Sequence, residues 1–416
     1  MRRLFTLALV AVLTLGLVAL PAQAEDVEIH VYQLKVEINE AITNFVKRYS
    51  ENTPGVNVTV ETLGGGADYG GTLRAKLQAS QMPDIFMIEG KGGYDLWEEY
   101  ILDMSDADWV KDTDLAYYSP EGKAVGFPIG IEGFGLGYNA EILEKAGIDP
   151  AELTTFSATK EAFELLDNMK EDLGLDNVVS VGTSVAGLWW VTSQHVFNAF
   201  YAGYLDYNDD SVYQATVKGD VDQERLTAFA NYLKFLYDYS DPEILVNGTY
   251  DDQVAAFANG KTAFITQGNW TDPNFEQLGA TFPRGFVSHN FLEEESTGLY
   301  IAAPSWFVVN AKASPERQKA AIDFLNHMAL TEDGAKYIVE EAGMVPAFKS
   351  VKLVPKGDFS KALVEANARG GNFNWYFAQN PDGFNVNTLG PIFELLATGT
   401  VEDFVRDVTQ AFKDLN

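Results

Sequence analysis

A tryptophan that follows two glycine breaks is the first residue of this sequence whose setting indicates ligand chemistry. In residues 257–270, a helical pattern ends at Gly260 and a short apolar run follows at 263–265. Gly268 then interrupts the run two residues before Trp270. Ligands of open α/β sheets bind outside the carboxyl ends of strands. Trp270 is therefore a candidate platform for a ligand ring, and burial in a core is the alternative.

The same stretch also imitates a phosphate-binding loop. Gly260, Lys261 and Thr262 match the end of that motif, but Ala255 stands where its first glycine belongs. The helix also precedes the strand instead of following it. These residues do not predict nucleotide binding.

Other chemistries lack the residues they need. The chain contains no cysteine, which excludes disulfides, thiolate metal sites, cysteine nucleophiles and a lipid-anchoring cysteine. The four histidines are scattered without paired metal-ligand spacing, and there is no Gly-x-Ser-x-Gly motif. The acidic turn at 206–210 lacks the full pattern of a calcium loop. We therefore expect no metal and no cofactor.

The amino terminus has the pattern of a secretory signal peptide. Arg2 and Arg3 precede an apolar run at 4–20, and residues 21–24 end in an Ala-x-Ala site. We expect residues 1–24 to be removed and the mature protein to lie in the periplasm or outside the cell.

Charge limits the partners. The formal net charge of −31 becomes −33 without the two arginines of the signal peptide. Such a surface repels nucleic acid and anionic lipid, so neither is an expected partner.

The first part of the mature chain alternates strands and helices. Strand patterns at 27–31, 56–60 and 85–88 are separated by helical patterns at 38–49 and around Leu73. This order predicts a βαβ sheet. Polar residues follow two of the strands: Gln33 after the first, and Glu89 and Lys91 after the third.

Three later stretches have the character of crossings between domains. Five glycines lie inside an apolar, strand-like run at 126–139, where glycine indicates a bend or a close approach. Pro304 interrupts a second strand-like run at 296–310, and 343–346 forms a third irregular stretch. A helix is expected after Ser314, which suits an N-cap, and Pro315.

Four stretches together carry a family resemblance. They are Met82-Pro83-Asp84-Ile85; the run from Phe127 through Glu132 to Asn139; residues 257–270; and residues 306–310 with the helix at 321–330 and the stretch 343–346. In this order, behind a signal peptide, they resemble the extracellular solute-binding proteins of ATP-driven sugar importers, the group that includes maltodextrin-binding protein.

The resemblance implies an α/β fold with two lobes, the type II periplasmic binding protein fold, in which each lobe is a sheet flanked by helices. It places residues 25–131 with 305–345 in one lobe and 132–304 with 346–416 in the other. Ligand would bind between the lobes of a monomer, a hinge would close, and the closed form would dock on the membrane permease of an ABC transporter. No enzymatic activity is implied.

The resemblance also assigns ligand contacts. Trp270 matches a tryptophan that stacks on sugar, and Glu132 matches an acidic residue that accepts sugar hydroxyls. The further candidates, in chain order, are Gln33, Glu89, Lys91, Trp189, Trp190, Trp306, Arg369 and Trp375. One of Trp189 and Trp190 is expected to face the cleft.

Two alternatives stay open. A secreted glycoside hydrolase needs two carboxylates across the scissile bond, and acidic residues are abundant. The same fold could instead hold a peptide, polyamine, iron or phosphorylated glycerol. Tryptophans near the expected cleft favour carbohydrate, but they do not specify which sugar, its length or its linkage.

Overall fold

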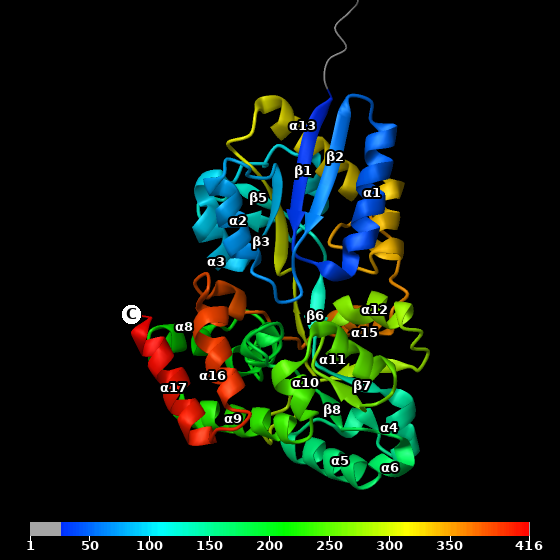
Figure 1. Cartoon of the computed structure of the whole chain (residues 1–416), viewed down its shortest axis with the longest axis vertical. Coiled ribbons are helices and arrows are strands. Elements are labelled where there is room, and N and C mark those ends of the chain that lie inside the picture. Colours follow the sequence, from blue (N-terminus) through cyan, green and yellow to red (C-terminus); the bar gives the residue numbers. More distant parts are fainter. Residues whose placement is uncertain (1–25, 416) are drawn as a thin grey trace, which may run out of the picture.

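The computed structural model describes residues 26–415, so the predicted signal peptide lies outside the described residues. Within 26–415, no helix has both the length and the apolar character needed to cross a membrane. The described chain forms two lobes, one above the other in Figure 1, with β6 (Glu132–Phe134) between them.

The first lobe is built on a six-stranded sheet in the order β2-β1-β3-β12-β5-β4. Its strands are β1 (Val27–Gln33), β2 (Val56–Thr62), β3 (Ile85–Glu89), β4 (Tyr117–Tyr118), β5 (Ala124–Pro128) and β12 (Ser305–Val309). The strands β1, β2 and β3 are parallel, which confirms the predicted βαβ order, whereas β12 runs antiparallel to both β3 and β5. The helices of this lobe are α1 (Asn39–Asn52), α2 (Tyr69–Gln78), α3 (Gly90–Trp97), α13 (Pro315–Leu330) and α14 (Glu332–Lys336).

Helix α13 begins as the sequence predicts. The Ser314 side chain accepts a hydrogen bond from the backbone N–H of Arg317, and Pro315 occupies the first turn. The apolar face of the helix, including Phe324 and Leu325, is fully buried in the core of the first lobe.

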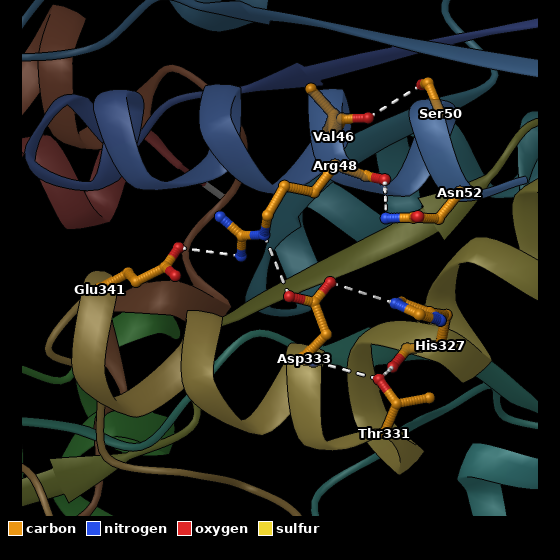
Figure 2. A network of polar contacts seen from close by, with 9 residues as sticks. Val46, Arg48, Ser50, Asn52, His327, Thr331, Asp333 and Glu341 are labelled. Carbon is orange, nitrogen blue, oxygen red and sulfur yellow. Dashed lines mark hydrogen bonds and ion pairs between the residues drawn. The ribbon is translucent and has the colours of Figure 1, made fainter.

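A polar network on the outside of this lobe ties α1 to the segment that leads into the third crossing (Figure 2). Arg48 on α1 donates from Nε to Asp333 Oδ1 and from Nη2 to Glu341 Oε2, each at 3.0 Å. His327 Nε2 lies 3.3 Å from the second oxygen of Asp333. Glu341 ends the π-helix Tyr337–Glu341, so the network fixes the chain just before it leaves the lobe.

The second lobe has a four-stranded sheet in the order β10-β7-β9-β8. Its strands are β7 (Leu136–Asn139), β8 (Val179–Ser180), β9 (Phe264–Ile265) and β10 (Arg284–Val287). The sequence pattern indicated a parallel sheet around 263–265. In the structure β9 is parallel to β8 but antiparallel to β7, because β7 enters this lobe directly from the first crossing.

Helices surround this smaller sheet. They are α4 (Ala140–Ala146), α5 (Phe156–Asn168), α6 (Lys170–Leu173), α7 (Asn198–Ala202), α8 (Ser211–Val217), α9 (Gln223–Asp238), α10 (Pro242–Asn247), α11 (Tyr250–Ala258), α12 (Asp272–Gln277), α15 (Asp358–Arg369), α16 (Gly390–Leu395) and α17 (Val401–Asp414).

The crossings lie together between the two sheets. Strand β6 pairs with β11 (Tyr300–Ala302) as a two-stranded sheet, and Ile131 bridges to Val345 from the third crossing. We retain the division into 25–131 with 305–345 and 132–304 with 346–416 as a proposal. It is supported by the separation of the six-stranded and four-stranded sheets between these sets of residues.

Close approach accounts for two of the glycines in the first crossing. A Cβ at Gly133 would lie 2.0 Å from Leu363 Cδ1, and one at Gly135 would lie 2.5 Å from the carbonyl oxygen of Val287. Gly135 therefore needs a residue without a side chain, whereas a side chain at Gly133 would have to displace the buried Leu363.

One buried carboxylate fastens the tail of the chain to the second lobe. Asp272 accepts hydrogen bonds from the backbone N–H groups of Ser360 at 2.7 Å and Phe359 at 3.3 Å, in the first turn of α15. Arg284 Nε lies 3.7 Å from the same carboxylate, and the side chains of Arg284 and Asp272 are 8% and 4% exposed.

Removing this carboxylate is expected to destabilise the fold. Asp272→Ala leaves the buried Arg284 without its carboxylate, which costs roughly 3–5 kcal/mol in the free energy of unfolding. Asp358→Ala, at a partly exposed carboxylate of the same helix, is the control and should cost about 1 kcal/mol or less. Urea unfolding measures both, and equal losses would contradict the anchoring role of Asp272.

Candidate functional site

The stretch around Trp270 folds as its sequence predicts. Helix α11 is followed by Gly260 in the left-handed region at φ +66°, then by β9 and Gly268. Trp270 lies in the short 3₁₀ turn Asn269–Thr271, and its Nε1 donates to Gln267 Oε1 at 2.8 Å. This bond fixes the half-buried indole, which leaves its ring free to contact other rings.

Three other ring systems of the second lobe gather around Trp270. Its ring centroid lies 4.8 Å from His195, 6.3 Å from Trp190 and 6.3 Å from Trp375. The structure thus brings together three of the tryptophans named as candidates, although their positions span 185 residues of sequence.

Of the adjacent pair, Trp190 joins these rings and Trp189 does not. Trp189 packs beside Gly390, where an added Cβ would lie 3.2 Å from the Cβ of the tryptophan. Its buried Nε1 has no hydrogen-bond partner among the described residues.

Sequence reasoning missed His195, which lies among the three tryptophan rings. Its centroid is 5.2 Å from Trp190 and 5.3 Å from Trp375, in addition to its contact with Trp270. Burial lowers the pKa of His195 to about 3, and the positive charge of Lys35 adds to that effect, so the imidazole is neutral near pH 7. His195 lies in the π-helix Val191–Val196. A π-helix brings residues five positions apart, such as Trp190 and His195, onto the same face. The 3.6-residue period of an α-helix does not place these two residues on one face, so the sequence pattern did not reveal them as neighbours.

A charged group faces these rings from the first lobe and the crossing. The Lys35 ammonium forms an ion pair with Glu132, the first residue of β6, and lies 3.9 Å from Glu37 Oε1. The three side chains are only 7%, 12% and 10% exposed, in the same order. Glu132 was a predicted ligand contact, whereas Lys35 and Glu37 carried no motif that distinguished them from other charged residues.

Carboxylates outnumber cations around Lys35, and this imbalance shifts the pKa values of the group. Burial, opposed by the positive charge of Lys35 and reinforced by the negative charge of Glu132, raises the pKa of Glu37 to about 7. For Lys35, burial acts to lower the pKa, but Glu132 and Glu37 outweigh it and hold the pKa above its ordinary value. Glu89, the last residue of β3, interacts electrostatically with Lys35 and Glu132. It also accepts a hydrogen bond from Ser305 Oγ at 3.4 Å.

Gln33 positions the loop that carries Lys35 and does not face the rings itself. Its fully buried side chain donates to the carbonyl oxygen of Lys35 at 2.9 Å and to Thr62 Oγ1 at 2.7 Å. It also accepts from the backbone N–H of Lys35 at 2.5 Å. These bonds hold the loop that carries Lys35, so Gln33 contributes by positioning its neighbour.

The remaining candidates lie apart from the rings and charges. Lys91 is exposed on α3, where it pairs with Asp95. Trp306 packs inside the first lobe and donates from Nε1 to the carbonyl oxygen of Leu115 at 2.8 Å. Arg369 is exposed at the end of α15 and donates to the carbonyl oxygen of Thr297 at 3.2 Å.

A small pocket separates the two lobes at this point. Its lining includes Lys35, Glu37, Glu132, Asn269, Trp270 and Met344, which come from both lobes and the third crossing. The cavity of about 10 Å³ holds roughly one water molecule. The lobes are therefore closed, and a ligand the size of a sugar ring requires them to part.

The arrangement suits a ligand that has an apolar face and a hydroxylated rim. Indole rings cover apolar C–H surface, while carboxylates accept from hydroxyl groups and the lysine ammonium donates to them. Within 26–415, no three histidines or carboxylates are placed to hold a metal ion.

Comparison with known proteins agrees with this architecture. An ABC transporter extracellular-binding protein of Pyrococcus horikoshii is 22% identical over 360 residues, which cover 82% of this chain and 76% of that protein. The melibiose/raffinose/stachyose-binding protein of Bacillus subtilis is 23% identical over 301 residues, which cover 69% of this chain and 66% of that relative. A sugar transporter protein of Bacillus licheniformis, solved in complex with stachyose, has a TM-score of 0.75 at 19% identity and covers 94% of this chain and 100% of its own.

A family model described as bacterial extracellular solute-binding protein matches residues 44–367, which is well over half of the sequence. The chain belongs to the bacterial extracellular solute-binding proteins.

Proposed function

We propose that this protein binds a sugar or oligosaccharide between its lobes and delivers it to the permease of an ABC importer. The observation that carries the proposal is the ring cluster of Trp190, Trp270 and Trp375, which faces the Lys35–Glu132 ion pair. The relatives that bind melibiose, raffinose and stachyose support a carbohydrate ligand.

When a sugar binds, contacts between the protein side chains of the cleft are replaced by contacts between those side chains and the sugar. A pyranose covers Trp270 with its C–H face, and its hydroxyl groups take up the hydrogen-bonding capacity of Glu132, Lys35 and Glu37. Because these groups come from both lobes, the sugar contacts all of them only in a closed cleft, which favours closure.

The remaining assignments follow from this function. The protein works as a monomer and has no catalytic activity. The predicted signal peptide directs it to the periplasm, and the absence of cysteine means that no lipid is attached through a cysteine thiol.

A secreted glycoside hydrolase is the second candidate, because the carboxylates of Glu37, Glu89 and Glu132 interact electrostatically with one another beside the rings. Incubating the protein with oligosaccharides separates the two functions, since steady release of shorter products would contradict a binding protein. If the cleft instead binds a non-sugar solute, no carbohydrate should change the melting temperature of the protein.

Loss of the indole of Trp270 should abolish recognition. In a thermal-shift panel that includes melibiose, raffinose and stachyose, we expect at least one neutral sugar to raise the melting temperature of the native protein. Trp270→Ala should weaken binding of that sugar by tenfold or more, which corresponds to about 1.4 kcal/mol of lost ring contact.

Trp306→Phe is the matched control, because it changes a tryptophan that packs inside the first lobe. It should keep the sugar-dependent shift. An unchanged shift in Trp270→Ala would remove Trp270 from the site, and a panel without any response would contradict sugar binding.

The carboxyl group of Glu37 should make stability depend on pH. Its pKa is about 7 in the folded protein and about 4.3 in an unfolded chain, so the folded state binds the proton more tightly. Stability therefore falls as pH rises between these two values and levels off above about 7. At about 1.4 kcal/mol per pKa unit, the loss reaches roughly 4 kcal/mol.

Glu37→Gln should lose less stability than the native protein between pH 5 and pH 8. Melting temperatures across this range measure the difference. Glu40→Gln, at an exposed position of α1, is the control and should follow the native curve. Parallel curves for the native protein and Glu37→Gln would show that Glu37 titrates normally.

A further inference from the structure

A short segment of the second lobe reaches across to the first lobe and touches α3. This segment, residues 378–382, is called the strap below. It follows Trp375 and Phe377, which pack in the core of the second lobe. In Figure 1 the turn that contains it, coloured orange-red, lies directly beneath α3.

The strap is held firmly by its own lobe. Asn380 donates from Nδ2 to Asn385 Oδ1 at 2.7 Å, and Asn385 donates to the carbonyl oxygen of Phe377 at 3.3 Å. The backbone N–H of Tyr376 donates to Asn198 Oδ1 at 2.8 Å. The strap therefore moves with the second lobe and is not a flexible lid.

Its contact with α3 is made by backbone atoms and the Cβ of Ala378. A Cβ at Gly92 would lie 2.3 Å from the carbonyl oxygen of Asn380, and one at Gly90 would lie 2.2 Å from the carbonyl oxygen of Ala378. Distances below 3.0 Å leave no room for any side chain at either glycine. The two lobes thus approach each other mainly through main-chain atoms at this edge of the cleft.

An ion pair lies beside this contact. Arg74 on α2 donates from Nη1 to Asp382 Oδ2 at 2.7 Å, and the two side chains are 44% and 40% exposed. Exposed pairs contribute little stability, but this one joins the strap to the first lobe in a defined orientation.

A second close contact between the lobes lies at Gly66 and Gly187. A Cβ at Gly66, in the first lobe, would lie 2.2 Å from the carbonyl oxygen of Gly187 in the second lobe. Close approach without side chains is thus a repeated feature of the boundary between the lobes.

We propose that the strap and the α3 glycines form a latch that holds the cleft closed through direct contact between the lobes, and that Gly90 and Gly92 are positioning residues for sugar binding. They touch no sugar and act through the angle between the lobes. Gly90 directly follows Glu89, so the latch also sets how closely that carboxylate approaches the second lobe. The assignment to sugar binding rests on the function proposed above, whereas the latch itself can be tested without any ligand.

Gly92→Ala is the sharpest probe. Gly92 does not occupy the left-handed region, so alanine adds a methyl group without backbone strain, whereas Gly90 has φ +51°. Gly93→Ala is the matched control on the same helix, since its Cβ would meet only Ile88 of the same lobe, at 3.2 Å.

The radius of gyration, measured by small-angle X-ray scattering with no sugar present, reports the lobe angle. We expect the native protein and Gly93→Ala to be compact and Gly92→Ala to be expanded, while its circular dichroism and melting temperature match those of Gly93→Ala. If the radius of gyration of Gly92→Ala equals that of the native protein, the proposal is overturned. This holds whether the two proteins are both compact or both expanded.

Exchanging the charges of the Arg74–Asp382 ion pair provides an independent test of the latch. Asp382→Arg places two positive charges together and should expand the molecule, and the double variant Arg74→Asp/Asp382→Arg should restore the compact radius. Failure of Asp382→Arg to expand the protein at low salt would also count against the latch. Because no sugar enters these measurements, a negative result would leave sugar binding standing, and an absent sugar response would leave the latch standing.

Discussion

The ion pair between Lys35 and Glu132 is the interaction on which the closed molecule depends. It joins the loop after β1 to the first crossing strand, and both side chains are almost completely shielded from water. Burying charges is costly unless each charge finds a partner. The pair therefore favours an arrangement in which the first lobe and the crossing strand supply each other with the opposite charge, and Glu37 and Glu89 add two further carboxylates to the group.

The two sides of the cleft provide different chemistry. The second lobe contributes rings, including the neutral imidazole of His195, while the first lobe and the crossing contribute the charged groups. Neither side alone presents both an apolar platform and a set of hydrogen-bonding groups. Recognition of an amphipathic ring therefore requires both lobes, which makes the angle between them part of the binding site.

Much of the fold could be predicted from local patterns. The strand and helix order of the first lobe, the N-cap at Ser314 and the position of Trp270 after Gly268 all follow from short stretches of sequence. The antiparallel insertion of β12 between β3 and β5 could not be predicted in this way, because it pairs residues more than 170 positions apart.

The site was less predictable for the same reason. Trp190, Trp270 and Trp375 could be named, but their meeting depends on packing between distant segments. Lys35 resembles any other charged residue in the sequence, and only its burial against Glu132 reveals its importance. Trp306 illustrates the opposite case, since its place in a crossing indicated a ligand contact, whereas its indole hydrogen-bonds inside the first lobe.

The threading of the chain has a consequence for biosynthesis. The six-stranded sheet needs β12 as an internal strand, and the core of the second lobe contains Phe404 and Phe412 from the final helix. Neither hydrophobic core can be completed until most of the polypeptide has been made, because sequentially distant segments must meet first. Completion of each lobe is therefore a late event relative to the emergence of the amino terminus from the ribosome. The path of the chain through the two sheets therefore sets the order in which the lobes can fold.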